Sequence, residues 1–158
     1  MFFATQGCLK SVLATQAASL LAWHGVQHGD RLGGLLFSDE GHFEVKPTRG
    51  RKGVLKFLHA CCQDVGWEKQ QSKLTEPLPL EHLTQRLRQV SKPGTLIYLL
   101  SDFRGLNERC VADLVQLARH NDVVLISIYD VMERQFPERG DYPVFDGSSY
   151  FKVSANSA

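Results

Sequence analysis

Residues 96–100 constrain the fold most, because this run of five apolar residues (Leu-Ile-Tyr-Leu-Leu) stops abruptly at Ser101 and Asp102. A short, wholly apolar run that follows Pro93-Gly94 predicts a β-strand buried on both faces. Ser101 and Asp102 then lie at the carboxyl end of that strand, where open α/β sheets bind their ligands. A hydroxyl beside a carboxylate can bind a divalent cation. Asp is also common at helix starts and in turns. Asp102 could therefore either bind a cation or cap the next helix or hold a turn.

The expected helices and strands alternate as they do in an α/β protein. A second buried strand is expected within residues 122–130, which contain Val-Val-Leu-Ile-Ser-Ile-Tyr. Apolar residues recur at helical spacing in four segments, residues 8–27, 51–65, 80–90 and 106–120. The last two helices each precede a strand. Two successive helix–strand units predict a parallel sheet covered by helices on both faces.

Helical spacing also predicts which side chains face the core. In the first helix these are Leu9, Val12, Leu13, Ala17, Leu20, Leu21 and His24, and in the second Val54, Leu58, Cys61, Cys62 and Val65. In the third they are Leu80, Leu83, Leu87 and Val90, and in the fourth Val111, Leu114, Val115 and Ala118.

The remaining segments predict a hairpin, a loop and a frayed end. Residues 32–37 and 42–45 flank a turn and predict an antiparallel hairpin at the sheet edge. Residues 66–79 are polar and lack a period, which predicts a loop. After Glu133 the chain is rich in turn residues, and residues 154–158 are expected to fray.

Composition excludes several classes of protein. The 158 residues, 43% hydrophobic and 22% charged, are typical of one globular domain. Eighteen basic and 17 acidic residues give no reason to expect nucleic acid as a partner. No apolar run approaches the ~20 residues of a membrane span, and no signal peptide is recognisable. The four scattered cysteines, without a CxxC motif, predict reduced thiols and a cytoplasmic location.

Three groups of residues could carry chemistry. Ser101, Asp102 and Asp130 follow two neighbouring strands and could share a hard cation such as Mg²⁺, although Asp130 could merely organise the loop before Glu133. A basic run could receive phosphate or an acidic partner, although a solvated loop explains it more simply; it comprises Lys46, Arg49, Arg51, Lys52 and Lys56. His24 and His28 have a spacing that permits two metal ligands, but Gly25 and the helix end disfavour a rigid site.

Motifs along nearly the whole chain resemble the bacterial family called domain of unknown function 58 (DUF58). They are Leu9-Lys10-Ser11-Val12-Leu13, Gly29-Asp30-Arg31-Leu32-Gly33, Leu36-Phe37-Ser38-Asp39, Arg49-Gly50-Arg51-Lys52, Leu99-Leu100-Ser101-Asp102-Phe103, Asp130, Glu133, Phe136-Pro137 and Gly140. The resemblance implies one von Willebrand factor A-like domain over residues 1–158. This is a Rossmann-like three-layer α/β sandwich with a mainly parallel sheet and an antiparallel edge hairpin.

The resemblance also implies a metal-ion-dependent adhesion site, of which Ser101-Asp102 matches the third element. The first element, Asp-x-Ser-x-Ser, would precede Met1, and Leu78-Pro79 occupies the place of the second, a Thr. Thr75 lies too far upstream to match it. We therefore expect an N-terminally truncated domain with an incomplete site. No cofactor is expected in this chain, and Mg²⁺ only if the upstream motif is present.

In a von Willebrand A sheet the first strand lies between the strands expected here at residues 32–37 and 96–100. Its absence would leave two unpaired strand edges, which invite pairing with a second chain. We therefore expect a homodimer through exposed sheet edges, or aggregation.

The expected function is a non-enzymatic protein-binding module. Members of the family often accompany MoxR-type AAA+ ATPases, so the resemblance implies such an ATPase as the partner, with no nucleic acid and no membrane span. The alternative from a different class is a metal-dependent hydrolase or phosphotransferase using Asp102 and Asp130. No motif positions a general base or a nucleophile for it.

Overall fold

The structure, a computed structural model, describes residues 8–38, 41–64, 79–134, 140–145 and 150–155. Its elements in chain order are α1 (Lys10–Gln27), β1 (Arg31–Ser38), β2 (Gly41–Arg49), α2 (Arg51–Asp64), α3 (Leu80–Val90), β3 (Leu96–Ser101), α4 (Glu108–Ala118), β4 (Asp122–Ser127), α5 (Val131–Arg134), β5 (Gly140–Phe145) and β6 (Tyr150–Ala155). The four helices and four strands expected up to residue 130 are therefore confirmed. The loop expected at residues 66–79 lies outside the described residues except for Pro79.

The described strands form three pairs, and together with the helices they make the fold mixed α/β. β3 and β4 are parallel and in register from Leu96 opposite Asp122 to Ser101 opposite Ser127, as predicted. β1 and β2 form the expected antiparallel hairpin, and β5 pairs with β6 in a second one. Among the described residues no ladder joins β1 to β3, so the two pairs are not hydrogen-bonded into one sheet.

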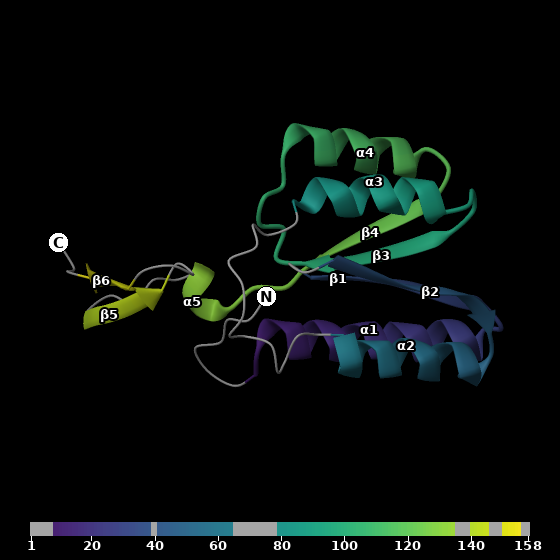
Figure 1. The fold of residues 1–158 in the computed structure, drawn as a ribbon, viewed down its shortest axis with the longest axis horizontal. Helices are drawn as coiled ribbons and strands as arrows, with labels where there is room; N and C mark the ends of the chain where they lie inside the picture. The colour runs from purple at the N-terminus through teal and green to yellow at the C-terminus, as the bar shows by residue number, and fades with distance from the viewer. Residues whose placement is uncertain (1–7, 39–40, 65–78, 135–139, 146–149, 156–158) are drawn as a thin grey trace.

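Helices lie on both sides of the strands, but they do not cover β3 on both faces. α3 and α4 lie on one side of the strands, and α1 and α2 on the other (Figure 1). Ile97 and Leu99 of β3 are buried, whereas Leu96 and Tyr98, which point to the opposite face, are 53% and 39% exposed. The expected burial of this strand on both faces is therefore wrong. The reason is that α1 and α2 pack mainly against β1 and β2.

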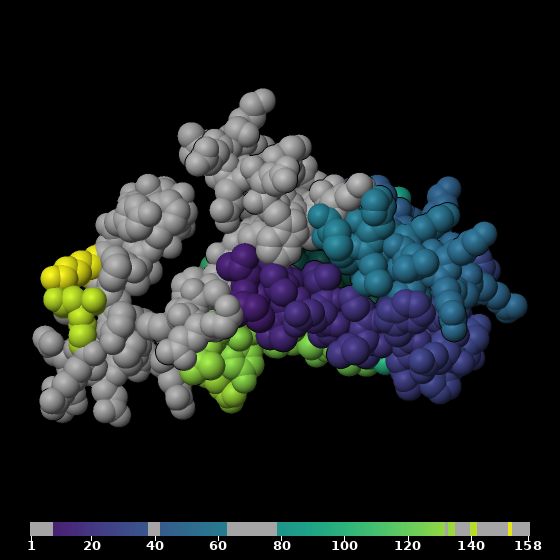
Figure 2. Space-filling view, turned by 90° about the horizontal axis from the view of Figure 1, so that it is seen from below, coloured from purple at the N-terminus to yellow at the C-terminus, as the bar shows by residue number. Residues whose placement is uncertain are grey.

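The view from the side of α1 and α2 also shows that these helices do not cover the strands completely (Figure 2). The two helices lie side by side, and green residues from the second half of the chain stay visible along α1 (Figure 2).

The core connects the hairpin β1–β2 to the parallel pair β3–β4. Its buried cluster consists of Leu80, Leu83, Leu99, Cys110 and Leu114, and Leu35 and Phe37 of β1 pack against it. On the other face of β1, a Cβ placed on Gly34 would lie 2.4 Å from Phe57 Cδ2 of α2. Glycine at this position therefore lets an aromatic ring of α2 rest on the strand backbone, so β1 has packing partners on both faces.

α1 turns a different side to the core from the one that its leucines predict. Lys10, Ser11, Ala14 and Ala22 are its buried residues, whereas Leu13 and Leu20 are 44% and 73% exposed, and His24 is exposed. Apolar residues occur all round this helix, so helical spacing alone cannot select one face. Small side chains on the buried side let α1 approach the strands closely.

α4 is also rotated relative to the prediction. Leu114 is buried as expected, together with Cys110, Asp113 and Leu117, but Val111, Val115 and Ala118 are exposed. Asp113 explains the rotation, because its carboxylate accepts a hydrogen bond from Thr84 Oγ1 at 3.1 Å and forms an ion pair with Arg88, both on α3. This polar contact turns Asp113 towards α3 and the stripe of Val111 and Val115 away from it. α3 itself buries Leu80 and Leu83 as predicted.

The hairpin β5–β6 was not expected, because Gly140, Pro143 and Gly147 indicate turns. Ser154 and Ala155, expected within the frayed tail, belong to β6, where Ser154 pairs with Asp141. Residues 156–158 lie outside the described residues. None of the helices that the structure describes is long and apolar enough to cross a membrane.

Candidate functional site at the carboxyl edge of β3 and β4

The parallel pairing of β3 and β4 brings the predicted site residues to one edge. Ser101 ends β3, its carbonyl oxygen accepts a hydrogen bond from Ile128 N at 2.9 Å, and Asp102 follows. Asp130 lies just beyond β4 and directly before α5. The sequence therefore predicted correctly that the ends of two neighbouring parallel strands carry these polar residues.

Ser101 and Asp102 both hold the turn that follows β3. Ser101 Oγ accepts a hydrogen bond from Phe103 N at 3.1 Å, and Asp102 Oδ1 accepts one from Arg104 N at 3.4 Å. Phe103 has a positive φ of 53°, a left-handed conformation that costs a non-glycine residue about 1–3 kcal/mol. α4 is capped by Asn107, whose side chain accepts a hydrogen bond from Cys110 N at 2.9 Å. Asp102 therefore stabilises a turn and is not the helix cap.

Lys10, which the sequence analysis did not assign to the site, reaches it from the first turn of α1. Its side chain is only 3% exposed, and Nζ lies 3.1 Å from Asp102 Oδ2 and 2.8 Å from Glu133 Oε1. A cation at a helix N-terminus is disfavoured by the helix dipole, and α1 has no side-chain cap there. The two carboxylates compensate for both the burial and the dipole. Only the rotation of α1, which the sequence does not reveal, identifies this role.

Arg104 and Glu133 complete a charged cluster, which we call the Lys10 cluster (Lys10, Asp102, Arg104 and Glu133). Arg104 Nη2 lies 2.7 Å from Glu133 Oε1, and Arg104 Nε lies 3.8 Å from Asp102 Oδ2. Glu133 Oε2 accepts a hydrogen bond from Asp130 N at 2.9 Å. Burial alone would raise the pKa of Glu133. The hydrogen bonds from Lys10, the backbone of Asp130 and Arg104, together with the charge of Lys10, outweigh burial and hold that pKa below its ordinary value.

These contacts occupy oxygen atoms that a cation would need as ligands. Asp102 Oδ2 already contacts the Lys10 ammonium, which would repel a divalent cation at that oxygen, and Ser101 Oγ is used by a backbone N–H. No group of three or more His, Cys, Asp or Glu residues could hold a metal ion in the part of the chain that the structure describes. The donor set around Asp102 therefore does not fit the cation that the adhesion-site resemblance implies.

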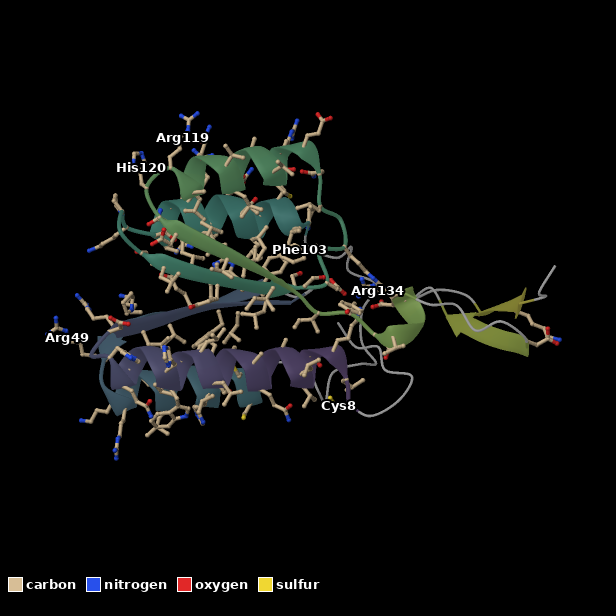
Figure 3. The ribbon with its side chains drawn as sticks, turned by 180° about the vertical axis from the view of Figure 1, so that it is seen from behind. Cys8, Arg49, Phe103, Arg119, His120 and Arg134 are labelled. Atoms are coloured by element: carbon tan, nitrogen blue, oxygen red, sulfur yellow. The ribbon has the colours of Figure 1, made fainter. Side chains whose placement is uncertain are left out.

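Exposed apolar and aromatic side chains lie in the two segments that flank the Lys10 cluster. Leu106, after β3, is 46% exposed, whereas Tyr129 and Val131, after β4, are 48% and 70% exposed. Arg134 Nη1 donates a hydrogen bond to Tyr129 Oη at 2.9 Å, and its guanidinium carbon lies 5.3 Å from the centre of that ring. Phe103 and Arg134 lie on the same side of the layered body of helices and strands, the side from which the chain continues to β5 and β6 (Figure 3). We call Arg104, Leu106, Tyr129, Val131 and Arg134 the edge surface.

The two other groups singled out in the sequence lie apart from the Lys10 cluster. All five residues of the basic run are exposed, and Arg49 lies at the end of the molecule opposite Phe103 and Arg134 (Figure 3). His24 and His28 are exposed, their ring centroids are 4.4 Å apart, and His28 Nδ1 lies 2.8 Å from the carbonyl oxygen of His24. That backbone contact occupies one of the nitrogens that a metal would need.

Cys8, Cys61, Cys62 and Cys110 are free thiols. Cys61 is buried, and its burial and the neighbouring Cys62 raise its pKa to about 11. The Cys61 thiol therefore stays protonated, and unreactive, at neutral pH.

Comparison with known proteins yields one match. The family model described as Protein of unknown function DUF58 matches residues 1–157. No curated protein and no solved structure is similar enough to match the chain.

Proposed function

Because this chain belongs to the DUF58 family, whose function is not known, we propose that it is a non-enzymatic protein-binding module of von Willebrand factor A type. Its partner in this proposal is a MoxR-type AAA+ ATPase, bound through the edge surface. Ser101-Asp102 then corresponds to the third element of a metal-ion-dependent adhesion site, and Asp130 follows the neighbouring strand. The parallel pair β3–β4, the hairpin β1–β2 and helices on both sides support this type of fold.

The exposure of apolar and aromatic residues at the carboxyl edge carries the proposal. Three large side chains remain exposed to solvent here, those of Leu106, Tyr129 and Val131. They belong to the two segments that flank the Lys10 cluster, whose charges are paired with one another. Exposed apolar residues surrounded by charged groups mark protein-binding surfaces, and Tyr and Arg are the residues that most often dominate binding energy there. The free thiols among the described residues support a reducing, cytoplasmic setting for this interaction.

The test is to measure the affinity of the purified chain for a purified MoxR-type ATPase. Val131→Asp places a charge at the most exposed apolar residue of the edge surface and should weaken binding at least tenfold, the loss expected when a buried apolar contact of about 1.4 kcal/mol or more is removed. Leu20→Asp is the matched control, because Leu20 is 73% exposed on α1, outside the edge surface. It should bind like the unaltered chain. Equal affinity of the Val131→Asp variant, or no binding by any form, would refute the proposal.

A metal-dependent hydrolase or phosphotransferase that uses Asp102 and Asp130 is the alternative, and the pairing of Asp102 with Lys10 does not favour it. Release of phosphate from a generic phosphate ester distinguishes the two functions. A Mg²⁺-dependent activity that is lost in Asp102→Ala would establish the enzyme in place of the binding module.

A further inference from the structure

α4 carries a second apolar stripe on the side that faces away from α3. Val111 and Val115 are 46% and 55% exposed, and Ala118 extends the same stripe. Asp113, which contacts Thr84 and Arg88 of α3, lies two residues from Val111. At 3.6 residues per turn this places the two side chains about 200° apart around the helix. The stripe therefore lies on the side of α4 away from α3, and α4 itself packs against β4.

Among the residues that the structure describes, none pairs with the outer edge of β4. Asp122 N donates to Thr95 O and Ile128 N donates to Ser101 O, so these N–H groups point towards β3. Because successive residues of a strand alternate, the N–H groups of Val123, Leu125 and Ser127 point outwards. No described strand pairs with that edge. It contains neither proline nor lysine, the residues that commonly protect strand edges.

Leu125 is an exposed apolar side chain of β4 on the side of the strands where α4 lies. It is 51% exposed and stands opposite Leu99 in the parallel ladder, so both side chains point to the face that α3 and α4 cover. Leu125, the valine stripe of α4, which packs against β4, and the β4 edge that is unpaired among the described residues together offer an apolar surface.

We propose that this surface binds a second copy of the chain, through a two-fold axis perpendicular to the sheet. β4 pairs antiparallel with β4 of the second copy, with Leu125 opposite Leu125 and Val123 opposite Ser127. This register uses all the outward N–H groups of Val123, Leu125 and Ser127, and keeps both α4 helices on the same face. It uses the outer edge of β4, whereas the homodimer expected from the resemblance uses the edges of the strands at residues 32–37 and 96–100, and it does not use the edge surface of the proposed function.

Charge complementarity supports a second copy as the partner. Glu108 and Arg119 lie three residues before Val111 and four residues after Val115, on the same side of α4 as the stripe. Both are exposed, and neither forms an ion pair with a residue that the structure describes. Arg119 lies at the end of α4 remote from Phe103 (Figure 3). Two antiparallel α4 helices therefore bring Glu108 of each copy to Arg119 of the other, as an isologous interface requires.

Sedimentation equilibrium of the full chain tests the proposal. The chain should be dimeric, and Val115→Asp, at an exposed helix position, should raise the dimer dissociation constant at least tenfold. Leu20→Asp, a change of the same kind on α1, should leave it unchanged. A monomeric unaltered chain, or a dimer that tolerates Val115→Asp, would overturn the proposal.

Charge reversal provides a second test, in which a recovered heterodimer also shows that both variants fold. Glu108→Arg places two like charges together at both contacts of a homodimer, and so does Arg119→Glu, so each variant alone should be monomeric. Mixed in equal amounts they should form a heterodimer, because arginine then meets glutamate at both contacts. Failure of the mixture to associate more strongly than either variant alone would exclude the antiparallel α4 contact.

Discussion

At the scale of single residues, Lys10 has the most distinctive environment. Its ammonium is almost wholly buried at the N-terminus of α1 and is held by the carboxylates of Asp102 and Glu133. The segment Leu9–Leu13 could be recognised in the sequence, but the role of Lys10 within it could not. A lysine at a helix start is normally solvated, and the tertiary contacts of α1 and of the two carboxylates bury this one.

Lys10→Met should destabilise the fold by about 2–3 kcal/mol at pH 7, because it removes the partner of two partly buried carboxylates. Arg104→Met is the control and should cost about 0.5 kcal/mol or less, since Arg104 is 72% exposed. The lowered pKa of Glu133 means that its contribution is present above the ordinary value and is lost as the pH falls through the lower, folded value.

The difference between the unaltered chain and Lys10→Met should therefore shrink in acid. Urea unfolding at a series of pH values measures it. Equal losses for the two variants, or a difference independent of pH, would contradict this role of Lys10.

At the scale of elements, the sequence predicts best where the apolar residues of a segment allow only one arrangement of its strand or helix. The apolar runs at residues 96–100 and 122–130 lead correctly to a parallel pair, and α3 has a single apolar face. α1 and α4 have apolar residues on more than one side, so their faces depend on Asp113, Lys10 and the small residues of α1. The hairpin β5–β6 was missed because its turn-forming residues conceal its strands.

The elements that end at the carboxyl edge also determine whether this edge can bind Mg²⁺. Mg²⁺ takes six oxygen ligands, several of them waters, in near-ideal geometry, and besides Ser101, Asp102 and Asp130 the carboxylate that reaches this edge is that of Glu133, which is paired with Lys10 and Arg104. Asp102 is moreover paired with Lys10. We therefore predict no tight Mg²⁺ binding. Calorimetric titration of the chain with Mg²⁺ measures this, and micromolar affinity that Asp102→Ala abolishes would contradict it.

At the scale of the whole molecule, packing rather than backbone pairing joins the two strand pairs. Leu35 and Phe37 of β1 pack against the cluster around Leu99, while β1 and β3 share no ladder among the described residues. Nothing in the composition of the chain predicts that side-chain packing, rather than a ladder, joins these two pairs. The carboxyl edge and the outer edge of β4 remain as two separate surfaces, one proposed for an ATPase and one for a second copy.

Amide hydrogen exchange, measured with and without a purified MoxR-type ATPase, tests most directly whether the carboxyl edge is the protein-binding surface. We predict slower exchange in residues 103–107 and 128–134, which contain the edge surface, and unchanged exchange in β1, β2 and α2. Unchanged exchange at saturating ATPase, or protection confined to other elements, would contradict the proposed function.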